Sequence, residues 1–503
     1  MSQLVHRSTR HALISTRRAG WIAGPLTATL LLTGCGSDSA GSSSSSVANG
    51  STPAVAAGSS SADSSAEDSG GPAAGSTSES GGSGGTATSS ESIGSPSSPT
   101  LSSATLSGST AVSGSSAVSG SSAVSGSSAV SGSTADSSTP QLDAKGCIAD
   151  FDSKADYYPD KQKLEFAKNF TISYRKSYQL VTVTPPGGAA ESYLLLHCGA
   201  PKPALAGELA KAQVVSTPVR SLYSASTSHL PSLVALDQLD TLTGVASASF
   251  VSEKQVLDRF AQHTPVEFAP TGPIDAERVV NGKPDVLVGS GFPDESDGKM
   301  KAAGIPVLQD VDFAESDPLG RAEWIKFFAA LTGTEGKAGT VFDKIVTDYR
   351  ATAKVAAGAE PVQIVPGQPY QGTWYVPGGK SWNAKLFADA GGSTAWAKDT
   401  TAASIKTTFE AVYAKAARSP VWLASTTWTT EKQALAEDPR FARFAAFAAH
   451  NVWNPVKGVT KAGGNPYYEM GVARPDLVLA DLVAILHPEI MPSHEFTFYL
   501  HLK

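Results

Sequence analysis

The chain has 503 residues, of which 41% are hydrophobic and 17% are charged, and its formal net charge is −7. Residues 1–34 contain four arginines and no acidic residue, so removing them from the charge of −7 leaves −11. This acidity argues against a nucleic-acid partner, because neutralising phosphates requires a basic surface. Residues 140–503 are long enough for two α/β lobes, which excludes a disulfide-dependent miniprotein and a multi-span membrane protein.

The N-terminus predicts an export signal. A basic stretch precedes an apolar segment near residues 19–32, which is too short to span a bilayer stably, and Leu32-Thr33-Gly34-Cys35 follows. Small residues before a cysteine resemble the lipobox of bacterial lipoproteins. The resemblance implies that residues 1–34 are removed, that Cys35 is acylated, and that the protein is held at the extracytoplasmic face of the cell membrane. An ordinary secretory signal fits less well, because a Ser/Gly-rich stretch begins immediately afterwards.

Residues 35–139 read as a disordered tether. They consist mainly of Ser, Gly, Ala and Thr, contain a hexad repeated over residues 111–128, and have no aromatic residue. So little apolar surface cannot offset the entropy of ordering the chain. A flexible coil of this length has a root-mean-square span of roughly 50–60 Å. The hydroxyl-rich tether is compatible with a glycosylation target and with a spacer through a cell wall.

Two cysteines remain if Cys35 takes lipid. Cys147 and Cys198 form an even pair in an exported protein, which most simply predicts a disulfide. A metal site is the weaker alternative, because no CxxC or HxxxH spacing accompanies them.

The first predicted elements of the folded part are three short strands, separated by turn-prone residues and rich in aromatic and β-branched residues. An alternation of apolar strands and amphipathic helices follows from Val214 onward and predicts parallel βαβ units. The three strands are Phe170–Tyr174, Tyr178–Thr184 and Glu191–Cys198, and the later elements are strands at Val219–Tyr223, Val286–Val288 and Pro306–Leu308 with a helix at Leu230–Leu236.

A long helical stretch at about residues 320–355 comes next, with apolar residues at three- and four-residue spacings. Gly333, Gly336 and Gly339 interrupt it, which predicts a kink or two abutting helices. The α/β alternation then resumes, with strands at Gln371–Val376 and Pro420–Leu423, a helix at Ala384–Ala390 and a terminal strand at Glu495–Leu500.

The predicted fold class is therefore α/β: two Rossmann-like lobes joined by a long helix. The domains are an N-terminal lobe with an opening β-segment at residues 140–320, a linking helix at 321–357 and a C-terminal lobe at 358–503.

An exported, tethered pair of α/β lobes joined by a long helix resembles the class III substrate-binding lipoproteins of ABC importers, which deliver ferric siderophores, haem and cobalamin. The resemblance covers roughly Val214 to the C-terminus, and the opening segment with its two cysteines departs from it. The matching stretches, in order, are Ser221–Leu236, Glu277–Val288, Asp317–Trp324, Gly372–Gly379, Phe409–Glu410, Asp438–Phe441, Arg474–Asp481 and His487–Glu489.

The resemblance implies a docking role for one Glu on each lobe. Glu277 and Glu410 each stand shortly before a predicted strand, and in the family such residues meet arginines on a symmetric permease dimer with its ATPase. Two separated anionic points on rigid lobes give a docking face register and orientation more than raw affinity. A Glu on an exposed helix is ordinarily only solvated, so it is the pairing that favours this role.

Ligand-binding candidates are residues expected where loops converge between the lobes at the carboxyl ends of strands. Aromatic residues near an arginine suit a flat or greasy chelate with anionic edges. Core packing is the alternative for each Trp, and turn capping is the alternative for the histidine. The candidates are Ser226, Thr227, His229, Phe292, Glu315, Arg321, Trp374, Trp382 and Trp428.

Other chemistries find little support. His487, His494 and His501 recur every seven residues, a spacing that suits neither helical nor strand chelation, so they are predicted to be structural. No Gly-x-Ser-x-Gly elbow, Walker loop or HExxH motif occurs, so no enzyme is predicted.

The predicted function is capture of a metal chelate, most simply a ferric siderophore, with no cofactor, and its delivery to an ABC permease. Haem or cobalamin binding on the same scaffold, and a stalked cell-surface enzyme or adhesin, are the alternatives.

Overall fold

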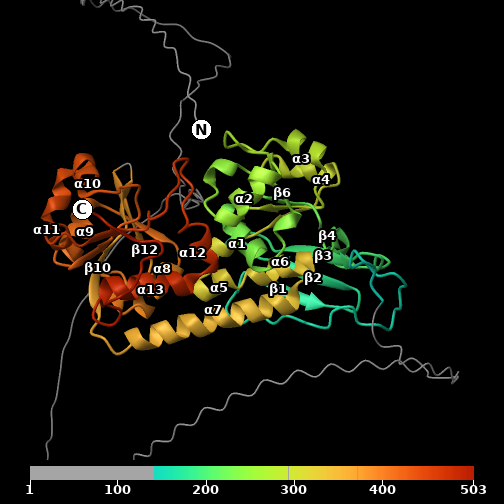
Figure 1. The fold of residues 1–503 in the computed structure, drawn as a ribbon, viewed down its shortest axis with the longest axis horizontal. Coiled ribbons are helices and arrows are strands. Elements are labelled where there is room, and N and C mark those ends of the chain that lie inside the picture. The colour runs from blue at the N-terminus through green and yellow to red at the C-terminus, as the bar shows by residue number, and fades with distance from the viewer. Residues whose placement is uncertain (1–140, 293, 371) are drawn as a thin grey trace, which may run out of the picture. The chain divides into compact units, whose positions relative to one another are not determined.

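The computed structural model describes residues 141–292, 294–370 and 372–503, which lie within one compact unit (Figure 1). The predicted signal, Cys35 and the whole predicted tether lie outside the described residues. Two lobes, each built on a five-stranded sheet, confirm the predicted α/β class.

The N-terminal lobe is built on a parallel sheet in the order β7-β6-β5-β8-β9. Strand β5 begins three residues later than predicted, whereas β8 covers the whole predicted strand. The strands are β5 (Leu222–Ser224), β6 (Leu242–Val245), β7 (Val266–Glu267), β8 (Val286–Gly289) and β9 (Val307–Gln309), and the helices are α1 (Leu230–Ala235), α2 (Lys254–Gln262), α3 (Ala276–Gly282) and α4 (Asp297–Ala302).

The opening segment forms a separate sheet in the order β1-β2-β3-β4. Strands β1 (Phe170–Tyr174), β2 (Tyr178–Val183) and β3 (Glu191–His197) are antiparallel, and β4 (Gln213–Thr217) pairs in parallel with β3. A disulfide joins Cys147 to Cys198 directly after β3, which confirms the predicted pair.

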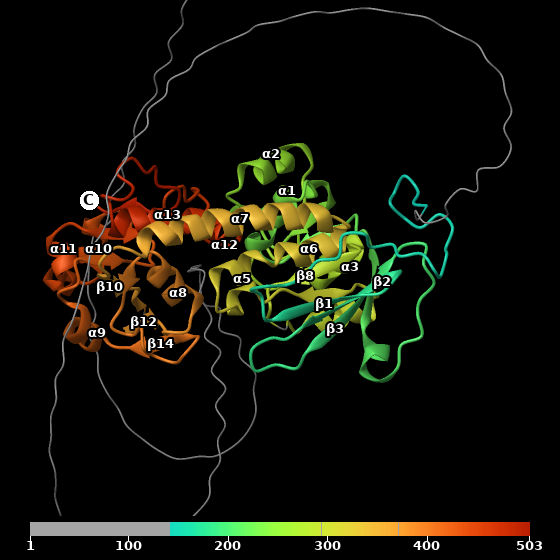
Figure 2. The same ribbon diagram turned by 90° about the horizontal axis from the view of Figure 1, so that it is seen from below.

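Three helices make the link between the lobes: α5 (Pro318–Ala322), α6 (Ile325–Thr332) and α7 (Glu335–Ala356). Gly333 ends α6 with φ of +70°, a left-handed conformation that glycine adopts without steric cost. The prediction of two abutting helices at the glycines is confirmed, although Gly336 and Gly339 lie inside α7. Helix α7 runs alongside both lobes in Figures 1 and 2.

The C-terminal lobe repeats the α/β plan with a sheet in the order β13-β10-β15-β16-β17, in which only β17 is antiparallel. A small antiparallel sheet, β11-β12-β14, lies beside it. The strands are β10 (Val362–Pro366), β11 (Gln368–Tyr370), β12 (Thr373–Pro377), β13 (Gly392–Ser393), β14 (Ser404–Thr407), β15 (Val421–Leu423), β16 (Val452–Asn454) and β17 (Leu500–His501), and the helices are α8 (Trp382–Asp389), α9 (Phe409–Ala416), α10 (Glu431–Glu437), α11 (Ala445–Ala448), α12 (Met470–Ala473) and α13 (Pro475–Leu486).

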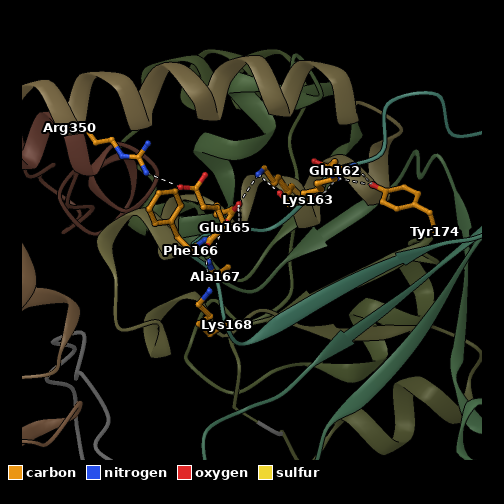
Figure 3. Close-up of polar contacts among 10 residues, drawn as sticks. Gln162, Lys163, Glu165, Phe166, Ala167, Lys168, Tyr174 and Arg350 are labelled. Atoms are coloured by element: carbon orange, nitrogen blue, oxygen red, sulfur yellow. Dashed lines mark hydrogen bonds and ion pairs between the residues drawn. The ribbon is translucent and has the colours of Figure 1, made fainter.

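A strap of residues 160–169 fastens the opening sheet to the linking helices (Figure 3). The buried carboxylate of Glu323 accepts hydrogen bonds from the backbone N–H groups of residues 165, 166 and 167 at 2.7–3.1 Å. Lys326 Nζ donates to Lys163 O and pairs with Glu323, both at 2.7 Å. Arg350 on α7 reaches the strap through Glu165 at 2.8 Å. The strap therefore joins the opening segment to α7.

One apolar core runs through the N-terminal lobe, the linking helices and α13, and an aromatic core fills the C-terminal lobe around Trp374, Trp422 and Phe444. Within the part of the chain that the structure describes, no helix has the length and apolar character needed to cross a membrane.

Candidate functional site

A small pocket, partly open to solvent, lies where α5 and α8 meet α12 and α13. Helix α12 also contacts α1 and the one-turn helix Thr227–His229 of the other lobe, so it lies between the two lobes (Figure 1). The lining is mostly apolar and aromatic: Pro318, Arg321, Trp382, Leu386, Tyr467, Tyr468, Gly471, Val472, Pro475 and Val478.

Arg321 and Trp382 are the two predicted ligand residues that the pocket brings together. The guanidinium carbon of Arg321 lies 4.3 Å from the centre of a Trp382 ring, a cation–π contact. Its Nη2 lies 3.5 Å from Asp312 Oδ2, while its Nε is buried without a hydrogen-bond partner among the described residues. Asp317 caps α5 and thereby fixes the helix that carries Arg321.

Acidic side chains gather behind Arg321. Asp310 and Asp312 follow β9 directly, and both are buried. Burial raises the pKa of Asp310 well above its usual value, with nearby Asp312 adding to the effect and Arg321 opposing it. Burial also raises the pKa of Asp312, again against the influence of Arg321. The positive charge of Arg321 therefore lies close to two buried carboxyl groups, those of Asp310 and Asp312.

His229 lies in the core and outside the pocket lining, and its role in ligand binding stays a prediction from the sequence. It is 1% exposed and its ring packs on Phe328. Its Nδ1 lies 2.9 Å from Ser224 Oγ, and its Nε2 lies 3.5 Å from Asp310 Oδ2. Burial lowers the pKa of His229 to about 3, which keeps the ring neutral.

Three further candidates are structural because they are buried with their polar atoms bonded inside the fold. Glu315 accepts the backbone N–H groups of Lys168 and Asn169 and the indole N–H of Trp324, at 2.9–3.1 Å, and so holds the strap. Trp374 donates to Pro366 O at 3.0 Å, and Trp428 donates to Glu437 at 2.8 Å. None of Glu315, Trp374 and Trp428 lines the pocket, and their roles in ligand binding stay predictions from the sequence.

Ser226, Thr227 and Phe292 lie outside the pocket lining. Ser226 is half-buried and caps the turn through Ser228, and Thr227 is the first residue of that turn. Phe292 is 47% exposed and stacks on Phe313, which is 36% exposed, with ring centres 4.9 Å apart. Phe292 follows the end of β8 and Phe313 follows the end of β9, and ligand residues were expected at such strand ends. The two rings together form an exposed aromatic surface.

Tyr467 and Tyr468 line the pocket but were missed from the sequence. They lie in a segment without helical or strand periodicity, just before α12. Glu469 beside them is fully buried and accepts the backbone N–H of Ser252 at 2.6 Å and the Ser252 hydroxyl. Ser252 belongs to the N-terminal lobe, so this contact forms a latch between the lobes next to the pocket.

Glu277 and Glu410 occupy equivalent positions. Each is the second residue of a short helix that leads to a core strand, behind a capping Asp275 in α3 and a capping Thr408 in α9. Both are exposed. Glu410 pairs with Arg440 at 3.0 Å. A backbone hydrogen bond at the start of α9, together with Thr408 and Arg440, lowers the pKa of Glu410.

The three C-terminal histidines are separate structural groups. His487 Nε2 lies 3.2 Å from Gly391 O, His494 Nε2 lies 2.7 Å from Asp481, and His501 Nε2 lies 2.5 Å from His450 O. No group of three or more His, Cys, Asp or Glu side chains suited to a metal ion occurs in the part of the chain that is described.

Comparison with known proteins identifies the periplasmic binding protein family over residues 222–454. An uncharacterised lipoprotein of Methanocaldococcus jannaschii is 24% identical over 371 residues, covering 67% of this chain and 84% of the relative. A second lipoprotein of the same organism is 23% identical, covering 60% of this chain and 78% of the relative.

Similar solved structures include two periplasmic binding proteins. A periplasmic haem-binding protein from Pseudomonas aeruginosa has 18% identity and a TM-score of 0.44, covering 57% of this chain and 98% of that one. The vitamin B12-binding protein of Vibrio cholerae has 17% identity and a TM-score of 0.39, covering 55% and 99%.

Proposed function

We propose that this chain captures a metal chelate, a ferric siderophore, and delivers it to an ABC permease, because residues 222–454 match the model of the periplasmic binding protein family. The family consists of extracytoplasmic solute-binding proteins, which are not enzymes and carry a small molecule as cargo. The proposal concerns the identity of that cargo and the way in which it is handed over.

The observation that carries the proposal is the pocket beside α12. Aromatic side chains and one arginine converge there, and Trp382 and the two tyrosines offer flat faces to a conjugated or apolar ligand. The pocket is lined by α5 of the link and by residues of the C-terminal lobe, and α12 beside it contacts α1 of the N-terminal lobe.

We also propose that Glu277 and Glu410 dock the protein on its permease. Their matching helix positions and their exposure support equivalent roles on the two lobes. The two sites differ in one respect, because Arg440 already pairs with Glu410. Docking arginines would therefore have to displace a neighbouring guanidinium on one lobe.

For the whole chain we propose a signal at residues 1–34, a lipidated tether at 35–139, lobes at 140–320 and 358–503, and a link at 321–357. Acylation of Cys35 would hold the protein at the extracytoplasmic face of the cell membrane, and more than one acyl chain is needed for stable anchoring. The two archaeal relatives are themselves lipoproteins, which supports the anchor.

Ligand capture is tested by thermal unfolding of the purified protein with ferric siderophores, free Fe(III), haemin, cobalamin and Zn(II). A ligand present at about 100 times its dissociation constant adds about 2.7 kcal/mol to the free energy of unfolding. A shift with a ferric siderophore is the expected result. A higher unfolding temperature with haemin or cobalamin alone would identify that compound as the cargo in place of a ferric siderophore. Turnover of a surface polymer, with no change in unfolding temperature for any ligand, would contradict the transport proposal.

Docking is tested by the double substitution Glu277→Lys and Glu410→Lys. Uptake by cells should be lost while ligand-induced stabilisation is retained, because the two residues lie outside the pocket lining. The matched control is Glu360→Lys with Glu495→Lys, which changes the charge equally at two other exposed positions. Loss of ligand binding in the docking variant would contradict the assigned roles.

A further inference from the structure

The charge balance of the pocket restricts the cargo that it accepts. Of the ten residues that line it, Arg321 alone is charged at neutral pH. A single arginine in an aromatic pocket would ordinarily suggest an anionic ligand. The groups that surround this guanidinium instead disfavour an anionic ligand.

Arg321 is already matched by acidic groups of its own chain. Its side chain is 12% exposed, and the partner carboxylate of Asp312, 3.5 Å away, is 10% exposed, so water screens the pair only weakly. Asp310 and Glu315 are buried on the same segment, two residues before Asp312 and three after it. The carboxyl groups of Asp312 and Asp310 therefore both lie near this guanidinium.

The remaining surface of the pocket also disfavours negative charge. Trp382 presents a ring face to Arg321, and the negative face of a ring contributes further to balancing the cation. Tyr467 and Tyr468 add more aromatic surface. An anionic ligand that reached Arg321 would have to displace Asp312, which would leave a buried carboxylate unpaired, a costly arrangement.

We propose that Asp312, by pairing with Arg321, makes the pocket select chelates without net negative charge. This rests on the proposed function and narrows it. The favoured cargo is a neutral or cationic ferric chelate of the trihydroxamate class, in which the ligand anions balance the ferric ion. Chelates with an excess of anionic groups, such as ferric tricatecholates and ferric citrate, are disfavoured.

The test compares ligands by charge. Binding is measured by quenching of tryptophan fluorescence and by thermal unfolding, with ferrichrome as the neutral probe, ferrioxamine B as the cationic probe, and ferric enterobactin and ferric citrate as anionic probes. The wild-type protein should bind the neutral and cationic probes at least about tenfold more tightly than the anionic ones, equivalent to about 1.4 kcal/mol.

The variant Asp312→Asn should narrow or reverse this order, because it frees the charge of Arg321 while keeping the side-chain shape. Asp258→Asn removes the same charge from an exposed residue of α2 that does not line the pocket, and it should leave the order of affinities unchanged. The wild-type ranking tests the proposal even if Asp312→Asn fails to fold.

Two outcomes distinguish a failure of the charge selection from a failure of the proposed siderophore capture. Tighter binding of the anionic probes by the wild-type protein, or an unchanged order in a folded Asp312→Asn protein, would overturn the selection by charge and leave siderophore capture standing. Binding of none of the four probes would overturn ferric siderophore capture, and this inference with it.

Discussion

His229 is a histidine kept neutral by its surroundings. The ring is buried between Ser224 and Asp310, and burial lowers its pKa to about 3 from an ordinary value near 6.5. Between these two values the unfolded chain binds a proton that the folded chain does not. The stability contributed by the neutral ring is therefore fully present above about pH 6.5 and is lost as the pH falls toward 3.

Replacing the ring with a group that does not titrate should flatten this pH dependence. We expect His229→Gln to lower the slope of unfolding free energy against pH, between about pH 4 and 6, by up to ~1.4 kcal/mol per pH unit. Urea unfolding at a series of pH values measures the slope. The exposed His263 provides the control variant His263→Gln, and an equal slope in the His229 variant and the wild type would contradict the argument.

The types of residue in the sequence predicted only some of the side chains that line the pocket. Arg321 and Trp382 were predicted and meet in the pocket, because α5, which carries Arg321, contacts α8, which begins at Trp382. Glu315 was placed in the same cleft but instead bonds the strap, since a sequence does not show whether a carboxyl group faces solvent or buried N–H groups. Tyr467 and Tyr468 carried no periodic signal that could have placed them.

Among the elements, the strap depends on one buried carboxylate. Glu323 accepts three backbone N–H groups and pairs with Lys326, so its removal would leave a buried ammonium unpaired. We expect Glu323→Ala to cost about 3–5 kcal/mol of unfolding free energy and Glu323→Gln to cost less, because the amide oxygen still accepts hydrogen bonds.

Chemical denaturation measures both variants. Glu165→Ala is the matched control, since it removes a carboxylate from the same strap, but one that is 63% exposed and paired with Arg350 at the surface. Its cost should stay within about 1 kcal/mol. Equal costs for the two Ala variants would show that the buried bonds do not hold the strap.

The latch between the lobes is a second element-scale feature. Glu469→Ala would remove the acceptor for Ser252 and release the segment that carries both pocket tyrosines. We expect a loss of about 1–3 kcal/mol and faster amide hydrogen exchange at Ser252 and over residues 464–473. Ser252→Ala, which retains the backbone N–H, should have a smaller effect. Unchanged exchange in the Glu469 variant would contradict a latch.

The elements themselves were largely predictable. Strand β1 matches its predicted range, and β2 and β3 match within one residue, because alternating β-branched and aromatic residues end at clear turn signals. The terminal strand was predicted at Glu495–Leu500 but forms at Leu500–His501, where pairing with β16 decides its position. The position of so short a strand is set by its pairing partner, and its own residues show no pattern that predicts it.

At the scale of the whole molecule, the disulfide closes a long loop around the opening sheet. Cys147 and Cys198 are 51 residues apart, and the chain-entropy relation gives a contribution of about 4 kcal/mol for a loop of that length. We expect Cys147→Ser with Cys198→Ser to lower the unfolding free energy by that order. Calorimetry on the oxidised protein and the variant measures the difference, and equal stabilities would contradict it.

The same crosslink also decides how mechanical force would pass through the fold. Tension applied at residue 141 and at the C-terminus crosses from Cys147 directly to Cys198, so residues 148–197, with β1, β2 and β3, lie outside the covalent path of the force. Reduction would place those strands in the line of pull and add up to ~170 Å of extensible chain. A protein that hangs from a surface by its N-terminal end would thus have its opening sheet shielded from shear for as long as the bond stays oxidised.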